Sequence, residues 1–543
     1  MAMRILVADE LAEEGLDFLK QSGIEFDVKV GLKEDALAAI VGQYDGLIVR
    51  SGAKVTARVL ENPGRLKAIA RAGVGVDNIH LPSATARGIL VMNTAAASTL
   101  STAEHALALL LALARKIPAA DAHVRSAPPK WSKSNFEGTQ LAGKTLGVVG
   151  LGRIGTTVAA RALAMEMKVL GYDPLITQPA VLDGRVRLIR DFDEFLSQLD
   201  IITFHVPLTP DTRHLLNRDR LFNKCKPHLL VVNDARGEVI DEYALAEALA
   251  AGRIAGAALD VFAKEPPPPD HPLLKLPNVV LTPHLGASTE EAQTAVSVEA
   301  CRAVVAYLTR GEIRGAVNAG DIRLDLPPDE APFADLARRI GALLAALCEG
   351  GYKTITIRAS GQRAQKLLPT LQRLAAVELL RPYLDMPVNV INVEHVASQR
   401  GIELLAVPEP EPPQGLVGDI VGVRASSANG ESHRILGTVY ADGLPRILRI
   451  DNFNMDMVPE GNMVIIMNRD QPGVIGMVGT TFGSSRINIA DMVISREFLK
   501  DGSAVAMMLI KTDSPPTDEL LNGLRMQPPI LKVKAAALPP RRA

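Results

Sequence analysis

Three side chains near the middle of the chain carry the chemistry for an acid–base reaction on a hydroxy acid. Arg236, Glu265 and His284 each come shortly after a short apolar run of the kind that forms a buried strand. Because the carboxyl ends of parallel strands meet at one edge of a sheet, we expect these side chains to reach one cleft. An arginine binds a carboxylate through two hydrogen bonds, and a histidine takes or returns a hydroxyl proton. A glutamate beside the histidine favours the imidazolium form and fixes its tautomer.

Each residue has a simpler interpretation when it is taken singly. An arginine on a loop is usually a surface ion pair, and a histidine is more often structural than catalytic. Other histidines, such as His205, His214 and His228, are expected to be structural. The three strand-end residues together predict hydride transfer at a 2-hydroxy acid, provided that a dinucleotide binds beside them.

A glycine triplet predicts that dinucleotide site. Gly150, Gly152 and Gly155 follow the apolar run Leu146–Val149 and open a helical stretch. In this arrangement the first glycine allows a tight turn, the second lets a pyrophosphate approach the backbone, and the third allows close packing of helix and strand. The helix start offers free N–H groups to the phosphates. Asp173 ends the next apolar run, where a carboxylate binds the adenosine ribose and repels the extra phosphate of NADP, so NAD is expected.

Composition excludes several other classes of protein. A chain of 543 residues with 47% hydrophobic and 22% charged residues is expected to form several globular domains. A net charge of −2 gives no basic surface for nucleic acid, and no apolar run is long enough to span a membrane. Cys225, Cys301 and Cys348 have no metal-ligand spacing and are an odd number, so neither a metal site nor a disulfide framework is expected. We expect a cytoplasmic protein.

The elements that must position these residues predict an α/β fold with two Rossmann-like lobes. Strand-like runs alternate with helical stretches from residue 5 to residue 92, and again around and after the glycine triplet. Ser101 and Glu104 form an expected capping box for a helix that reaches Arg115 and links the lobes, and a helix over Glu290–Leu308 crosses back. The substrate lobe is therefore expected at 1–98 and 286–318, and the NAD lobe at 99–285.

Two smaller units are expected after these lobes. The tract Asp325–Pro332 has the composition of a linker, and an α+β unit over 319–457 contains a hairpin around Tyr440–Gly443. From 460 to 543 the order strand, helix, strand, strand, helix, strand is ferredoxin-like.

Several of these motifs together resemble a known family. GLGRIG, NDARG, ALDVFAKEPP and TPHLGAST are similar to segments of the D-isomer-specific 2-hydroxyacid dehydrogenases. GLIVRSGAKVT (46–56), RAGVGVDNI (71–79) and the four-unit layout resemble the members of that family that act on D-3-phosphoglycerate. This resemblance covers essentially the whole chain and implies oxidation of D-3-phosphoglycerate to 3-phosphohydroxypyruvate with NAD, the first step of phosphorylated L-serine biosynthesis.

The resemblance also implies a role for individual residues. Arg236, Glu265 and His284 correspond to the catalytic set of the family. The residues implied in cofactor binding are Gly150, Gly152, Arg153, Ile154, Gly155, Asp173, Pro207, Ala235 and Asp260, with Asp260 at the nicotinamide carboxamide. Those implied in binding the carboxylate and phosphate of the substrate are Arg50, Arg71, Val74, Gly75 and Lys133.

The chain departs from the family pattern at a few of these positions. After Asn93 it has TAAASTLS, so Ser98 and Thr99 would have to replace an Asn-Ser pair. Lys133 stands where arginine is common and would give a point charge instead of a fork. Asp234 replaces a small neutral residue and Glu238 a glycine, so both acids are expected to alter ligand affinity.

The last unit resembles ACT domains, which commonly bind amino acids at dimer interfaces. Asn468, Asp470 and Asn488 match positions that hold serine in regulated relatives, so L-serine is an expected effector and a homodimer or homotetramer an expected assembly. The alternative is a purely structural dimerisation module. In the preceding unit, Arg446 and Arg449 either bind an anionic effector or form surface ion pairs.

Two other functions remain open at this point. One is a general D-2-hydroxyacid dehydrogenase that reduces hydroxypyruvate or glyoxylate. The other is an NAD-sensing interaction protein built on the same fold, which the complete Arg-Glu-His set disfavours.

Overall fold

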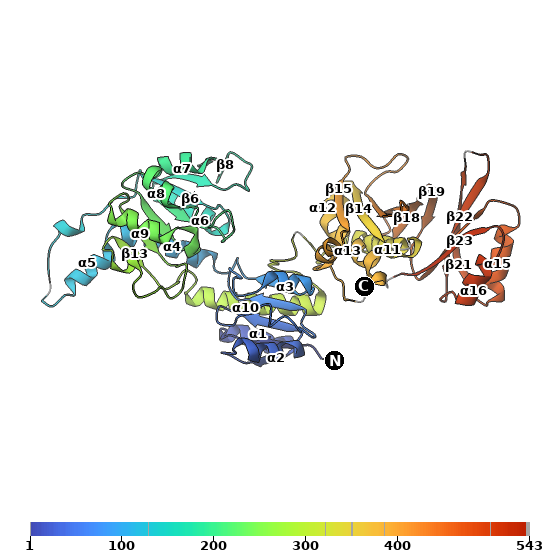
Figure 1. Ribbon diagram of the computed structural model, residues 1–543, viewed down its shortest axis with the longest axis horizontal. Coiled ribbons are helices and arrows are strands. Elements are labelled where there is room, and N and C mark those ends of the chain that lie inside the picture. Colours follow the sequence, from blue (N-terminus) through green and yellow to red (C-terminus); the bar gives the residue numbers. More distant parts are fainter. Residues whose placement is uncertain are drawn as a thin grey trace.

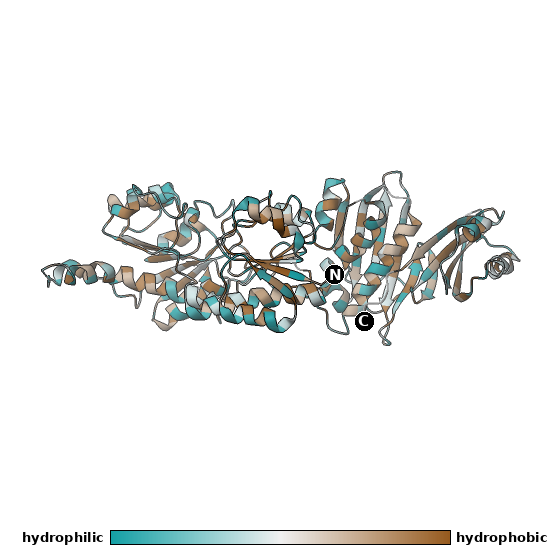
Figure 2. Ribbon diagram, turned by 90° about the horizontal axis from the view of Figure 1, so that it is seen from below, coloured by the Kyte–Doolittle hydropathy of each residue, from teal (hydrophilic) through white to brown (hydrophobic). Residues whose placement is uncertain are grey.

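The computed structural model describes residues 2–128, 130–320, 322–348, 351–384, 386–499 and 501–538. Within these residues the chain forms four sheets in an elongated molecule, with the second sheet of the chain at one end and then the first, the third and the fourth (Figure 1). Apolar residues concentrate along the strands (Figure 2). In the described ranges no helix combines the length and the apolar character needed to cross a membrane.

The first sheet is parallel, with strand order β2-β1-β3-β4-β5 and helices on both faces, as expected. Its strands are β1 (Arg4–Val7), β2 (Glu25–Val28), β3 (Gly46–Val49), β4 (Ala68–Arg71) and β5 (Leu90–Asn93). The helices that belong to this lobe are α1 (Glu13–Ser22), α2 (Glu34–Ile40), α3 (Leu81–Ala86) and, from later in the chain, α10 (Glu290–Arg310). β2 was not expected, because it is an edge strand with alternating acids in place of an apolar run.

The second sheet has the order β13-β12-β11-β10-β6-β7-β9-β8 and is parallel except for β8. Its strands are β6 (Thr145–Val149), β7 (Lys168–Tyr172), β8 (Ala180–Val181), β9 (Val186–Leu188), β10 (Ile201–Phe204), β11 (Leu230–Asn233), β12 (Gly256–Leu259) and β13 (Val279–Leu281). Its helices are α4 (Thr99–Ala114), α6 (Arg153–Ala164), α7 (Phe192–Gln198), α8 (Arg218–Asn223) and α9 (Glu242–Ala250). The strand order switches at β6, because β7 pairs with one edge of β6 and β10 with the other. The carboxyl ends of β6 and β10 therefore flank a natural ligand crevice.

The helix that leads from the first lobe to the second begins earlier than expected, so the predicted capping box is wrong. α4 starts at Thr99, which places Ser101 and Glu104 inside its first turns. The Ser101 hydroxyl lies 2.8 Å from the Thr289 hydroxyl, at the start of α10. The serine therefore ties together the two helices that pass between the lobes.

The third sheet is mixed, with the order β15-β14-β16-β17-β18-β19. Its strands are β14 (Tyr352–Ser360), β15 (Glu403–Pro408), β16 (Ile420–Ser427), β17 (Ser432–Val439), β18 (Pro445–Ile450) and β19 (Phe453–Met457). Its helices are α11 (Ala331–Leu347), α12 (Gln362–Lys366), α13 (Leu368–Leu380) and α14 (Val393–Gln399). The predicted hairpin is confirmed as β17 and β18. α11 begins two residues before the end of the expected linker.

The fourth sheet confirms the ferredoxin-like prediction, with strand order β21-β22-β20-β23. Its elements are β20 (Asn462–Arg469), α15 (Val474–Ser484), β21 (Ile489–Phe498), β22 (Ala504–Thr512), α16 (Asp518–Arg525) and β23 (Ile530–Ala537). One face packs on α15 and α16. Met463, Ile465 and Leu509 on the other face join the core of the third sheet, so the last two units share one core.

Candidate active site

The glycine loop has the geometry that a dinucleotide requires. Gly150 follows β6 with φ +85°, and a Cβ there would meet the His205 carbonyl at 2.5 Å. A Cβ on Gly155 would overlap the Gly150 carbonyl, so helix and loop touch through these two glycines. A Cβ on Gly152 would have nothing within 4 Å, and α6 begins at the next residue, Arg153. An open space at the positive end of α6 fits a pyrophosphate.

The acid expected at the ribose stands beside this loop. Asp173 follows β7, and its Oδ2 accepts a 2.9 Å hydrogen bond from the Leu151 amide within the glycine loop. Its Oδ1 accepts a second bond, also of 2.9 Å, from the Leu175 amide. The carboxylate is therefore held at the edge of the loop. These residues fit a bound NAD, with Ile154 in the first turn of α6 and both Pro207 and Ala235 just after neighbouring strands.

The histidine and the glutamate of the catalytic set are in contact. His284 Nδ1 lies 2.8 Å from Glu265 Oε2, while Glu265 Oε1 accepts a hydrogen bond from the Phe262 amide at 3.1 Å. The side chains of His284 and Glu265 are 51% and 41% exposed, so a substrate can reach them. Because the Nδ1 side of the ring faces a carboxylate, the Nε2 atom is the one left for a ligand.

A buried carboxylate beneath this pair holds the loop that carries His284. Asp260, fully buried, accepts hydrogen bonds from the Thr282 hydroxyl at 2.5 Å, the Leu285 amide at 2.7 Å and the Gly286 amide at 2.8 Å. The His284 amide donates to the Asp260 carbonyl at 2.8 Å. The structure thus places Asp260 under the loop, and its expected contact with the nicotinamide carboxamide stays a prediction.

A histidine that no sequence pattern singles out completes this network. His105 Nε2, on α4, lies 3.1 Å from Asp260 Oδ1. Burial opposes the charged form of Asp260, but hydrogen bonds from His105, Thr282 and the Leu285 amide outweigh it and lower the pKa of Asp260 to about 2. The hydrogen bond to Asp260 in turn raises the pKa of His105, against its burial.

Arg236 reaches from the second lobe to the first. Its Nε and Nη2 atoms both lie 3.0 Å from Oδ2 of Asp77, an acid that the sequence interpretation did not single out. A Cβ on Gly75 would overlap Arg236 Nη2, so the guanidinium lies directly against the backbone of Gly75. A Cβ on Gly237 would overlap the backbone of Phe262, so the loop of Arg236 abuts the loop that ends at Glu265.

The two arginines expected at the phosphate lie beside Arg236. Arg71, at the end of β4, donates from Nε to the Arg50 carbonyl at 3.4 Å. Burial lowers the pKa of Arg71 to about 10, and the positive charges of Arg236 and Arg50 add to the effect. The Arg50 guanidinium donates to the Gln293 amide oxygen, on α10. Three cations thus converge with one exposed acid, Asp77, between them.

The loop that follows Arg71 is held by side chains at the end of β5. The Val74 carbonyl accepts a 2.6 Å hydrogen bond from Asn93, and the Gly73 amide donates to the Thr94 hydroxyl at 2.8 Å. In the altered segment that follows, Ser98 is buried, and the Thr99 hydroxyl donates to the Ala95 carbonyl at 3.1 Å. The Ser98 side chain is therefore enclosed by the protein, and the Thr99 hydroxyl is bound to the backbone of its own segment.

Lys133 is not brought to this cluster within the chain. It is exposed and directly precedes the turn η2 (Ser134–Phe136), on the segment that contains α5 (Ile117–Val124). This segment extends away from the rest of the second lobe (Figure 1). The sequence placed Lys133 with the other cations by family pattern alone, and spacing along the chain does not reveal how far the segment projects.

The two unusual acids near Arg236 have different surroundings. Asp234 is buried, with its Oδ1 3.3 Å from His205 Nδ1. Glu238 pairs with Arg213 at 2.5 Å near the surface. Asp234 therefore places a buried carboxyl group next to His205 at the carboxyl ends of β10 and β11, beside the glycine loop.

The three residues expected to hold serine bind different neighbours. Asn468 is buried and donates to the Arg469 carbonyl at 2.7 Å. Asp470 pairs with Arg496 at 3.1 Å. The Asn488 amide donates to Asp513 at 2.7 Å. Across the described ranges, no group of three or more His, Cys, Asp or Glu side chains is arranged to hold a metal ion.

Comparison with known proteins places this site in a family. The family description "D-isomer specific 2-hydroxyacid dehydrogenase, NAD binding domain" matches residues 107–286, and "D-3-phosphoglycerate dehydrogenase intervening domain" matches residues 330–451. The crystal structure of the TT0316 protein from Thermus thermophilus is similar with a TM-score of 0.54 and 39% identity, and the match covers 58% of this chain and 100% of that one.

Relatives extend the likeness over the C-terminal units. The chain is 42% identical over 521 residues to a D-3-phosphoglycerate dehydrogenase of Archaeoglobus fulgidus, a match that covers 96% of this chain and 97% of the relative. A D-3-phosphoglycerate dehydrogenase of Bacillus subtilis is 37% identical, with 99% of this chain and 100% of the relative covered. This chain belongs to the D-3-phosphoglycerate dehydrogenases, within the D-isomer-specific 2-hydroxyacid dehydrogenase family.

Proposed function

We propose that this protein oxidises D-3-phosphoglycerate to 3-phosphohydroxypyruvate with NAD, the first step of phosphorylated L-serine biosynthesis. The observation that carries the proposal is the convergence of Arg50, Arg71 and Arg236, with the loop of Arg236 against the loop that ends at Glu265, the partner of His284. One cation suffices for a carboxylate, so the additional arginines suit a substrate that also carries a phosphate.

Each residue would contribute a separate part of the reaction. NAD, which the glycine loop and Asp173 would hold, would supply the acceptor for the hydride that leaves C2 of the substrate. His284 takes the hydroxyl proton at Nε2, because its Nδ1 side faces Glu265 at 2.8 Å. Arg236 holds the carboxylate with its two-pronged guanidinium, after releasing Asp77. Arg50 and Arg71 hold the phosphate. In the reverse direction the protonated His284 returns its proton to the oxygen.

We assign the substrate lobe to 1–98 and 286–318, the NAD lobe to 99–285, the intervening unit to 319–457 and the ACT unit to 460–543. The four sheets and the return of α10 to the first lobe support this division. We further propose a cytoplasmic homodimer or homotetramer that L-serine inhibits through Asn468, Asp470 and Asn488. The ferredoxin-like sheet is the support for that regulation, and a purely structural role for the unit is the alternative.

The experiment that tests the function compares two substrates. NADH oxidation is followed with 3-phosphohydroxypyruvate and with hydroxypyruvate, in the wild-type enzyme and in Arg71→Ala, each with and without L-serine. We expect a strong preference for the phosphorylated acid that Arg71→Ala reduces by at least about tenfold, the scale of one lost charged hydrogen bond.

Each alternative gives a different result. Equal rates on both acids would make this a general 2-hydroxyacid dehydrogenase. No activity on any 2-oxo acid would favour an NAD-sensing protein. A rate that is indifferent to L-serine would remove the effector proposal and leave the substrate assignment intact.

A further inference from the structure

The third sheet has a covered face and an open face. α11 and α13 pack against Ile355, Val423 and Ile435 to form the core on one side. The opposite side carries arginines on three adjacent strands, namely Arg358 on β14, Arg424 on β16 and Arg434 on β17. These three side chains line one cavity, together with the Leu436 side chain.

The strand register forces two of these cations together. Arg424 and Arg434 are direct partners across β16 and β17, and side chains at such positions stand about 5 Å apart at Cβ. Like charges placed directly opposite each other destabilise a sheet. Among the residues that the structure describes, neither guanidinium makes a hydrogen bond or an ion pair. Partial burial lowers the pKa of Arg434, and the charges of Arg424 and Arg449 act in the same direction.

The neighbouring arginines, by contrast, have partners. Arg358 pairs with Glu409 at 2.8 Å, and Arg449 donates to the Asn454 amide oxygen at 3.1 Å. Arg446 pairs with Asp442 at 3.1 Å and Asp456 at 3.7 Å, so of the two interpretations of Arg446 its contacts match the surface ion pair. Arg358 and Arg446 thus have acidic partners and Arg449 has a neutral one, whereas Arg424 and Arg434 face each other with no partner among the described residues.

A proline-rich segment forms the rim of the cavity. Pro408, Pro410 and Pro413 line it beside Glu409 and Glu411. Prolines fix the backbone, so this rim loses little conformational freedom when a ligand binds. With three arginines and two glutamates in its lining, the cavity has a net charge of one positive unit. The glutamates on the rim disfavour anions too large to stay near the sheet.

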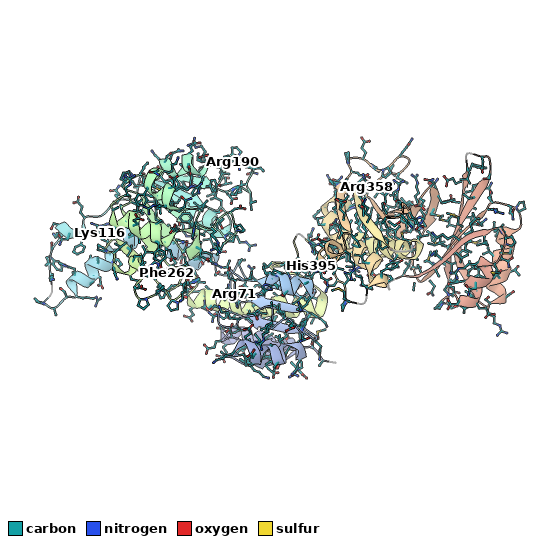
Figure 3. The ribbon with its side chains drawn as sticks, in the orientation of Figure 1. Arg71, Lys116, Arg190, Phe262, Arg358 and His395 are labelled. Carbon is teal, nitrogen blue, oxygen red and sulfur yellow. The ribbon has the colours of Figure 1, made fainter. Side chains whose placement is uncertain are left out.

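We propose that this cavity binds a small dianion, a phosphate or dicarboxylate group that bridges Arg424 and Arg434. An oxyanion accepts paired hydrogen bonds from each planar guanidinium and cancels the repulsion between them. The site is separate from the active site: Arg358 lies on the intervening unit, whereas Arg71 and Phe262 lie on the two lobes (Figure 3). The proposal does not depend on the substrate assigned above.

The test uses the full-length protein and Arg434→Gln, Arg424→Gln and Arg446→Gln. Arg446 is the matched control, because it is on the same sheet but already paired with acids. Equilibrium dialysis counts bound inorganic phosphate per chain, with malonate in a second arm and chloride at equal ionic strength in a third. The active site is intact in all three variants, so any phosphate bound there is common to them.

We expect wild type and Arg446→Gln to bind one more dianion per chain than the other two variants, whose affinity at this site falls at least about tenfold. Without added dianion, the melting temperature of Arg434→Gln should be no lower than that of wild type, because the repulsion between Arg424 and Arg434 is removed. Equal binding by all four proteins, or loss of binding in Arg446→Gln alone, would overturn the proposal. The phosphate and malonate arms show which dianion the site prefers. Binding of chloride, without binding of either dianion, would contradict the proposal.

Discussion

At the scale of single residues, the contact between His284 and Glu265 decides which nitrogen works. The carboxylate lies 2.8 Å from Nδ1 and holds a proton on that nitrogen. The ring therefore presents Nε2 to the substrate. The glutamate is itself oriented by the Phe262 amide. The acid–base function is thus built from two side chains and one backbone group.

Replacing Glu265 by glutamine keeps the size of the side chain and removes its charge. The imidazolium that forms during oxidation then loses its counter-ion, and we expect kcat to fall roughly ten- to a hundredfold in both directions. NADH affinity should be unchanged, because Glu265 contacts the catalytic loop and not the glycine loop. Steady-state rates and fluorescence titration of NADH measure the two quantities. A kcat within about twofold of wild type would remove Glu265 from the mechanism.

The Asp260–His105 pair predicts a dependence of stability on pH. The pKa of Asp260 is about 2 in the folded protein against an ordinary 3.8, so its stabilising contribution is present above pH 3.8 and is lost as pH falls toward 2. His105 has a raised pKa, so its contribution is present below its ordinary 6.5 and is lost as pH rises through the folded value.

Asp260→Asn should therefore unfold more easily than wild type near neutral pH, and the difference should shrink as pH falls below 3.8. Urea unfolding at a series of pH values measures both proteins. A difference that is independent of pH would mean that Asp260 acts through packing alone.

Residue types and spacing predicted which side chains would gather, but not their partners. Arg236, Glu265 and His284 were chosen because each follows a strand, and the loops of Arg236 and Glu265 do touch. Asp77 and His105 were missed, because their contacts arise only when the lobes and α4 fold together. Polar residues on a loop or a helix carry no signal of such a partner in the sequence.

At the scale of elements, apolar runs in the sequence predicted the central strands of the sheets but not the edge strands. β6 contains the whole of the expected apolar run Leu146–Val149, because buried parallel strands are continuous apolar runs. β2, β8 and β15 were missed, since edge strands are short or partly polar. Ser101 shows a second limit, because a hydroxyl can cap its own helix or bind another, and only the fold decides.

The glycine loop allows the roles of two glycines to be separated. Gly152→Ala places a methyl group in open space, so we expect normal thermal stability with NADH affinity weakened at least about tenfold, because the methyl occupies the path of the pyrophosphate. Gly155→Ala would overlap the Gly150 carbonyl, and we expect a lower melting temperature as well as weaker binding. Calorimetry and NADH titration of both variants distinguish the two effects. Equal loss of stability in both would contradict this assignment.

At the scale of the whole molecule, the order of the units was predictable and their docking was not. The proline-rich tract before α11 and the change of pattern after it predicted a boundary. Asn389 donates to the Gly88 carbonyl at 2.9 Å and so joins the intervening unit to the first lobe, a contact that no sequence pattern indicates. Arg339, buried, donates to the Pro459 carbonyl at 2.7 Å and so ties the last two units together.

The ion pair between Arg236 and Asp77 joins the two lobes across the cleft. Asp77 occupies the guanidinium fork that is proposed to receive the substrate carboxylate, so substrate must displace it. The Asp77 side chain is 66% exposed, and exposed ion pairs are worth about 0.2–1 kcal/mol. Asp77→Asn should therefore lower KM for the 2-oxo acid by up to about fivefold with little change in kcat, and the gain should fade as salt is added. Asp35→Asn, which removes another exposed acid of the same lobe paired with Arg58, is the control and should leave KM unchanged. If Asp77→Asn instead raises KM, then Asp77 does not compete with the substrate but helps to hold Arg236 in position for it.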